Sequence, residues 1–415
     1  MQRRLALERS APLWLSLRFF LSAPLFALLA GAVLLWQGGP ALASRWTPAA
    51  LAMTHLITLG VLSMVIVGAL LQLLPVVAGI DIAAPRLSAT VIHLLLCGGT
   101  LLLAAAFCWP RPALFRAALA PLVLALGWLL AACAAGLWRA RPGPAAAMLT
   151  GVRIALLSLF LTLLLGAAMA AALGWTRPLP LARLADLHAL WGMPGWIGVL
   201  VVAIAYQVIP MFQVTPVYPA ALTRTLCPAL LALLAANCAA QWSGHWSATP
   251  LRALLAAAFA LFALVTLSLL ARRKRPAPDA TTLFWRVSMA SLLACAALAC
   301  APWDEPRRAL LLGLLFLLGF AYSAIVGMLY KIVPFLLWHH WQEMGLARPV
   351  PSFRLIITEE AARAQFWSHL GALALLAAAV LWPELARAAA LALLAATLFL
   401  ARNLWRALRL APTRA

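Results

Sequence analysis

The sequence is poor in charged residues and poorest in acidic ones. Of its 415 residues, 10% are charged and 66% are hydrophobic, and Asp and Glu together number only 10. A water-soluble fold has too little interior to bury so much apolar surface, so lipid is the expected solvent for most of the chain. The formal net charge is +21, but the Arg residues lie in short segments between apolar runs. This placement indicates membrane topology and argues against nucleic acid as a partner.

Cysteine motifs and intramembrane carboxylates are also missing. The seven cysteines form no CxxC and no CxxCH, so the sequence predicts neither a disulfide framework nor covalent attachment of c-type heme. None of the carboxylates falls in the middle of an expected span, which removes the usual chemistry of proton-coupled or ion-coupled transport.

Long apolar runs are what the sequence has in abundance. Twelve runs have the length of a membrane span: 12–36, 50–77, 88–108, 113–137, 151–174, 188–213, 225–241, 249–271, 285–301, 309–336, 367–382 and 385–402. The sequence therefore predicts an all-α integral membrane protein in which residues 1–415 form one polytopic domain surrounded by membrane lipid. Lys and Arg gather at the termini and in the loops after even-numbered spans, which predicts a bacterial-type inner membrane with both termini cytoplasmic.

A repeated pattern organises the second, sixth and tenth spans. In each, a glycine is followed after twelve residues by a polar residue and after three more by a proline. The three sets are Gly60, Gln72 and Pro75; Gly195, Gln207 and Pro210; and Gly319, Lys331 and Pro334. The repeat predicts three units of about four helices, related by a pseudo-threefold axis along the membrane normal.

The polar members of this repeat, Gln72, Gln207 and Lys331, need an explanation because an amide or ammonium group that faces lipid is costly. We expect all three to face protein or water near the cytoplasmic end of their spans. One hypothesis is that they line a vestibule on the axis of a small-molecule or metal permease.

Two histidines, His55 and His188, enter the second and sixth spans, five and seven residues before the repeat glycines. A neutral imidazole there can ligate heme iron or copper, or it can hydrogen-bond a neighbouring helix, and the residues alone leave both interpretations open. Four further histidines are expected near the cytoplasmic face as a weaker candidate metal group: His93, His339, His340 and His369.

The segment THLITLGVLSMVIVGALLQLLPVVAGIDIAAPRLS resembles the second helix and following loop of heme-copper oxidase subunit I. In that family a heme-ligating histidine opens the helix, and His55 matches it. Pro75 and Gly79 match the helix exit. The loop is matched by Asp81, Ala83, Pro85, Arg86 and Leu87, with one loop residue missing. His188, with WGMPGWIGVLVVAIAYQVIP after it, is similar to the sixth helix of the family, whose opening histidine binds copper.

The spacing from Gly60 through Gly68 to Pro75 is also similar to that of the NnrS family. Those proteins have twelve helices, contain heme and copper, and are associated with nitric oxide and denitrification. The chain departs from the oxidase pattern because the seventh span has no paired histidines and the tenth has no HxH. Leu312 and Leu314 stand at the positions that correspond to His188 and His55.

The resemblance implies a heme-copper-oxidase subunit I-like fold that binds b-type heme or copper through His55 and His188. It implies respiratory or nitric-oxide physiology, while the missing ligands exclude an ordinary terminal oxidase. Two alternatives stay open. The chain could be a cofactor-free partner or assembly subunit of a respiratory complex, or the permease suggested by the polar repeat positions.

Overall fold

The computed structural model describes residues 8, 10–139, 143, 145–244, 248–275, 277–301, 305–344 and 352–410. Over these residues the secondary structure is helical, without a strand. Twelve helical stretches are long and apolar enough to cross a membrane. The chain is therefore a multi-pass integral membrane protein, and the predicted twelve spans are confirmed.

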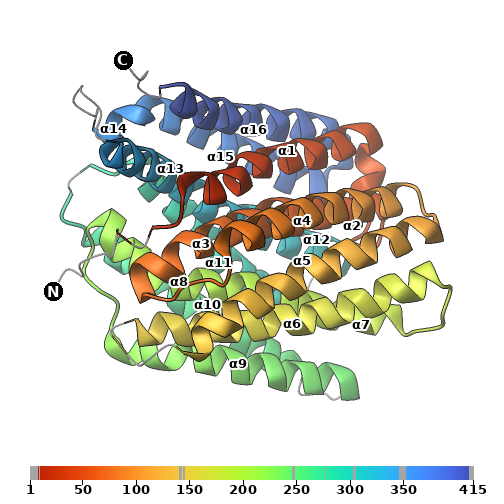
Figure 1. Cartoon of the computed structure of the whole chain (residues 1–415). Helices are drawn as coiled ribbons and strands as arrows, with labels where there is room; N and C mark the ends of the chain where they lie inside the picture. The colour runs from red at the N-terminus through yellow and green to blue at the C-terminus, as the bar shows by residue number, and fades with distance from the viewer. Residues whose placement is uncertain are drawn as a thin grey trace.

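The helical elements are α1 (Leu13–Gln37), η2 (Gly39–Leu42), α2 (Pro48–His55), η3 (Leu56–Ser63), α3 (Met64–Ala78), α4 (Pro85–Cys108), α5 (Pro112–Trp138), α6 (Ala146–Gly174), α7 (Leu181–Leu190), η4 (Trp191–Gly198), α8 (Val199–Gln213), α9 (Ala220–Ser243), α10 (Ala248–Ala271), α11 (Ala280–Cys300), α12 (Glu305–Leu314), η5 (Leu315–Tyr322), α13 (Ser323–Glu343), α14 (Phe353–Ile356), α15 (Glu359–Leu381), η6 (Pro383–Leu385) and α16 (Ala386–Arg409). Figure 1 shows a bundle in which α1 begins and α16 ends at the same end, on the left. We call this the terminal end and the other the opposite end.

Several helices extend past the apolar runs that predicted them. The tenth span continues to Glu343, and α15 begins at Glu359 although its apolar run begins at 367. Backbone hydrogen bonding carries a helix onward into residues that are polar enough to lie at the membrane interface. Hydrophobicity therefore located the spans, but it underestimated their length.

The second, sixth and tenth spans each contain a π-helical segment between two α-helices. These segments are η3, η4 and η5, each eight residues long, and in each the repeat glycine is the fifth residue. The π-helix is rare and is found mostly at functional sites. The repeat in the sequence is thus also a repeat of backbone conformation.

The repeat glycines allow a neighbouring helix to approach closely. A Cβ added at any of them would lie 2.9 Å or less from a side chain of the preceding span. The pairs are Gly60 with Phe26, Gly195 with Ser158, and Gly319 with Ser291. The glycines are therefore needed where each central helix packs against its predecessor.

The same helix neighbours occur in each of the three units. The first helix of a unit packs on the second: α1 on η3 and α3, α6 on η4 and α8, α11 on η5 and α13. The third packs on the fourth: α4 on α5, α9 on α10, and α15 on α16. The fourth then packs on the first of the next unit, and α16 returns to α1, so the three units close into a ring.

The variant Gly60→Ala tests this packing, because its new Cβ would lie 2.3 Å from the ring of Phe26. We expect a loss of about 1–3 kcal/mol in the free energy of unfolding, as for other overpacked cores. The matched control is Gly98→Ala in α4, where no atom lies within 4 Å of the added Cβ. Thermal unfolding in detergent should show a lower melting temperature for the first variant only, and equal melting temperatures would contradict the packing role.

Candidate cofactor site

A cavity of about 810 Å³ lies in the half of the bundle near the opposite end. Its walls come from all three central spans and from the helices around them, and they are mainly apolar. His55 and His188 both line it, so the structure brings together the two histidines singled out in the sequence. The size is within the range of about 300–1,000 Å³ typical of ligand pockets.

His55 is the last residue of α2, directly before the π-helical segment η3. Its Nδ1 lies 2.8 Å from the carbonyl oxygen of Leu51, one turn earlier in the same helix. The ring packs almost parallel to Phe107, with centroids 5.2 Å apart. A carbonyl can only accept, so Nδ1 carries the proton and Nε2 keeps its lone pair.

His188 lies in α7, three residues before η4. Its Nδ1 lies 3.0 Å from the carbonyl oxygen of Thr162 in α6. Gly166, one turn further along α6, makes room for the ring, because a Cβ there would lie 2.9 Å from the Cε1 atom of His188. The tautomer is therefore the same as at His55, with Nε2 as the basic nitrogen.

The two imidazole rings lie next to each other, with centroids 6.2 Å apart and planes inclined by 28°. A ligating imidazole nitrogen lies about 2.0–2.1 Å from its metal. Neighbouring rings at the observed separation are close enough to be considered as ligands of one bound group. Both Nδ1–H groups are held by backbone carbonyls, which is how ligating histidines are usually oriented.

The third repeat contributes leucines where the other two contribute histidines. Leu312 and Leu314 line the same cavity, as their place in the repeat suggests. Over the residues that the structure describes, no group of three or more His, Cys, Asp or Glu side chains is placed to hold a metal ion. Among the residues that the structure describes, the site therefore has two histidines.

Several cavity residues were not singled out from the sequence. The thioethers of Met53, Met169 and Met193 line the cavity, and so do three arginines, Arg45, Arg252 and Arg308. Thioether sulfur is a soft ligand that suits copper(I). A signal for Met53 did exist in the sequence, because it stands seven residues before Gly60, as His188 stands before Gly195. No comparable signal marks the arginines or the other two methionines.

Asp186, two residues before His188, does not support that imidazole. Its carboxylate instead forms an ion pair with Arg45, at 2.7 Å between Oδ1 and the guanidinium nitrogen. Both residues lie in α7, and helical residues two positions apart do not face each other.

Among the described residues, His93, His339, His340 and His369 belong to no group of three or more side chains placed to hold a metal ion. His93 Nε2 lies 2.8 Å from the hydroxyl of Ser22, and His369 Nε2 lies 2.8 Å from that of Ser323. His369 is in the middle of α15 and buried, because the helix begins eight residues before its apolar run. His339 faces Glu343, at 3.6 Å. Two of the four, His93 and His369, therefore act as hydrogen-bonding groups between helices.

All three polar repeat residues were expected to face protein or water. Gln72 and Lys331 contact protein groups, and Gln207 also has an interaction partner. Gln72 is buried, accepts a hydrogen bond from Ser10 and donates one to the carbonyl oxygen of Ala11. Lys331 forms an ion pair with Asp279, at 2.9 Å. Gln72 and Lys331 line one cavity at the terminal end, whose lining does not include Gln207.

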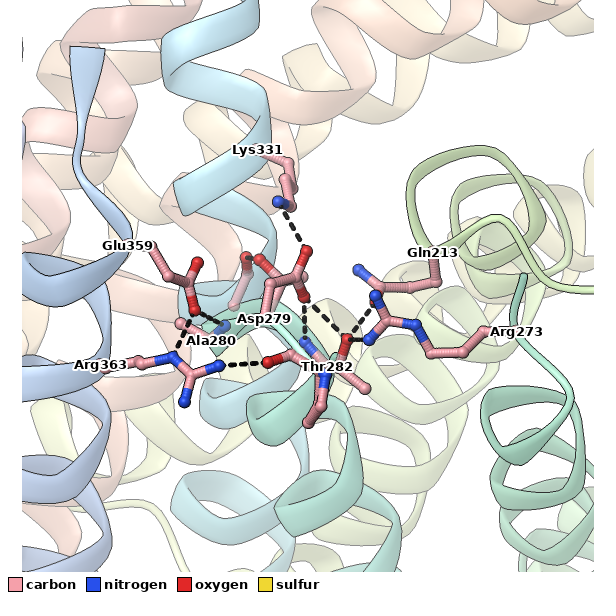
Figure 2. Close-up of polar contacts among 11 residues, drawn as sticks. Gln213, Arg273, Asp279, Ala280, Thr282, Lys331, Glu359 and Arg363 are labelled. Atoms are coloured by element: carbon pink, nitrogen blue, oxygen red, sulfur yellow. Dashed lines mark hydrogen bonds and ion pairs between the residues drawn. The ribbon is translucent and has the colours of Figure 1, made fainter. Parts of the chain in front are cut away.

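Asp279 is at the centre of a polar network that joins the α10–α11 loop to α13 and α8 (Figure 2). Its Oδ2 contacts Lys331, while its Oδ1 accepts hydrogen bonds from the amide and the hydroxyl of Thr282. The guanidinium of Arg273 donates to the same hydroxyl. Burial tends to raise the pKa of Asp279, but the Lys331 charge and the hydrogen bonds from Lys331 and Thr282 outweigh it, so the pKa lies below its usual value.

A second anchor lies beside this network in Figure 2. One oxygen of Glu359 accepts hydrogen bonds from Arg363 and from the backbone amide of Ala280, each at 2.7 Å. The Arg363 guanidinium also donates to the carbonyl oxygen of Pro278. These contacts attach the start of α11 to the start of α15.

Comparison with known proteins gives no relative. The sequence matches no protein-family model, and no curated protein matches it. The functional argument therefore depends on the geometry of the site itself.

The variant Asp279→Asn tests the half-buried ion pair, because the amide can still accept the hydrogen bond from the Thr282 amide. We expect the free energy of unfolding at pH 7 to fall by about 1–3 kcal/mol. The folded-state pKa is lowered, so this contribution is present above the ordinary carboxyl pKa and is lost as the pH falls below about 4. The melting temperature of Asp279→Asn should therefore lie below that of wild type at pH 7, and the difference between the two should become smaller as the pH is lowered.

The control for this measurement is Asp186→Asn. It breaks the more exposed pair with Arg45, in which the side chains are 37% and 41% exposed. Its expected effect is below about 1 kcal/mol. An equal effect of the two variants would contradict a special role for the Lys331–Asp279 pair.

Proposed function

We propose that the protein is a heme-copper-oxidase-like protein of the inner membrane that holds a b-type heme or a copper ion between His55 and His188. The observation that carries this proposal is the meeting of the two imidazoles in one cavity, 6.2 Å apart, with both Nε2 atoms free of hydrogen bonds to described residues. Their Nδ1 atoms are engaged by backbone carbonyls, so ligation would cost neither ring a hydrogen bond.

The helix arrangement supports the superfamily part of the proposal. The resemblance to subunit I of the heme-copper oxidases implies three four-helix units around a pseudo-threefold axis. Three π-helical segments at matching places and the recurring helix neighbours are the features that such an axis would produce. The NnrS-like sequence spacing of Gly60, Gly68 and Pro75 agrees with the same family.

The dimensions of the site favour heme over a bare copper ion. His55 and His188 would be the residues that hold the iron of a bound heme, since imidazole is a common heme ligand. A cavity of about 810 Å³ is much larger than one ion requires, and its apolar walls suit a flat hydrophobic macrocycle. Arg45, Arg252 and Arg308 line the cavity too and would offer positive charge to acidic substituents of the ligand. A copper ion would instead use the imidazoles together with one of the methionine thioethers.

The residues of the chain limit the chemistry. A bound heme or copper would supply one-electron transfer or binding of a small gas such as nitric oxide. A dioxygen-reducing heme and copper centre needs about four imidazoles, and the cavity has two among the described residues. His55 and His188 would orient the group, while the leucines of the third repeat exclude water. We therefore place the protein in respiratory or nitric-oxide physiology and not among the terminal oxidases.

The proposed orientation places the terminal end in the cytoplasm. Arg and Lys gather in the segments of that end, including the run 272–275 after α10. The cofactor cavity would then lie toward the periplasmic side.

Purified protein from heme-replete cells is expected to show a Soret band, or bound copper by elemental analysis. His55→Ala and His188→Ala should each remove or strongly weaken it, because each substitution takes away one of the two imidazole ligands that the cavity offers. The matched control is His93→Ala, which removes an imidazole bonded to Ser22 outside the cavity and should leave the colour or copper unchanged.

A colourless and copper-free wild-type preparation would overturn the proposal. Stable copurification with respiratory-complex subunits in that case would identify the partner or assembly subunit instead. Loss of the Soret band in the His93 variant as well would indicate a general folding defect and not ligation by the cavity histidines.

A further inference from the structure

A second cavity, of about 230 Å³, lies at the terminal end of the same three central spans. Its walls come from α3, α8 and α13, so each of the three repeats contributes to it. It shares no lining residue with the larger cavity. Any ligand of this cavity is therefore separate from the proposed cofactor.

The charged side chains that line this cavity are all positive. Lys331 and Arg275 line it, and none of its lining residues is a carboxylate. Lys331 is balanced by Asp279 from outside the lining. The guanidinium of Arg275, by contrast, is only partly exposed and forms no ion pair or hydrogen bond with a residue that the structure describes. A cation in partly buried surroundings favours an anionic ligand.

The other side chains that line this cavity indicate the size and polarity of the uncharged part of the ligand. They are formed mainly by aromatic and aliphatic side chains, among them Phe212, Phe335 and Phe353. The volume is below the range of about 300–1,000 Å³ that drug-sized ligands occupy. A short apolar body with one acidic group matches both the size and the polarity of this space.

We propose that this cavity binds a small organic anion, a carboxylate on a short apolar chain, with its acidic group at Arg275 and beside Lys331. The amide of Gln72 is held in place by Ser10 and Ala11, so we assign it to the wall and not to the charged head group. The anion could come from solution at the terminal end or from free fatty acids dissolved in the membrane, and both sources present the same carboxylate chemistry.

The test is saturable binding of radiolabelled octanoate to the full-length protein in non-ionic detergent. Wild type should bind one octanoate, which excess unlabelled octanoate displaces and octan-1-ol does not, because the alcohol has no charge for Arg275. Arg275→Gln should weaken binding at least tenfold, and Arg275→Lys should retain most of it. The matched control is Lys274→Gln, which changes the neighbouring exposed cation outside the cavity and should bind as wild type.

Several results would overturn the proposal: no saturable octanoate binding, equal binding by Arg275→Gln and wild type, or equal displacement by octan-1-ol. Displacement by palmitate at lower concentration than by unlabelled octanoate would support the carboxylate chemistry and identify the membrane as the source. His55→Ala should bind octanoate normally. A colourless, copper-free protein that binds octanoate would therefore contradict only the cofactor proposal. A coloured protein that does not bind octanoate would contradict only the organic-anion proposal.

Discussion

The constraint on which the structure depends is the shielding of three central helices from lipid. Within the apolar windows of Pro48–Ala78, Leu181–Gln213 and Pro306–Glu343, 72%, 67% and 67% of residues are buried, against 28–50% in the other nine spans. A bilayer does not tolerate polar side chains that face it, so such groups need a protein environment. The imidazoles of His55 and His188, the three π-helical segments and the polar repeat residues all lie on these three helices. The outer spans supply the apolar surround that makes this possible.

The sequence could predict the number of helices and the repeat because both depend on local properties. Apolar length sets the number of spans, and the spacing of Gly60, Gln72 and Pro75 survives in three copies that the structure repeats as backbone conformation. The ends of the helices were less predictable, because backbone hydrogen bonding extends each helix beyond its apolar run. That is why His369 is buried in mid-helix and not at the start of its helix.

The meeting of His55 and His188 could not be deduced from spacing alone. The two residues differ by two positions in the repeat, which corresponds to about 200° around an α-helix. The π-helical segments change the rotation of each helix, and the arrangement of the units then decides which side chains share a cavity. The resemblance assigned these histidines to different metals, whereas the geometry offers them to one group. Local sequence thus identified the two imidazoles, and only tertiary structure shows that they line one cavity.

Hydrogen bonding separates the two kinds of histidine in this protein. In His93 and His369 the Nε2 atom is engaged by a serine hydroxyl of another helix, so ligation through Nε2 would break an interhelical hydrogen bond. In His55 and His188 the backbone engages Nδ1 and leaves Nε2 available at the cavity. In an apolar interior an imidazole whose lone pair has no partner is costly to keep. A ligand on Nε2 removes that cost, and this is the physical reason to expect a cofactor where the pair meets and none where the serines already satisfy the rings.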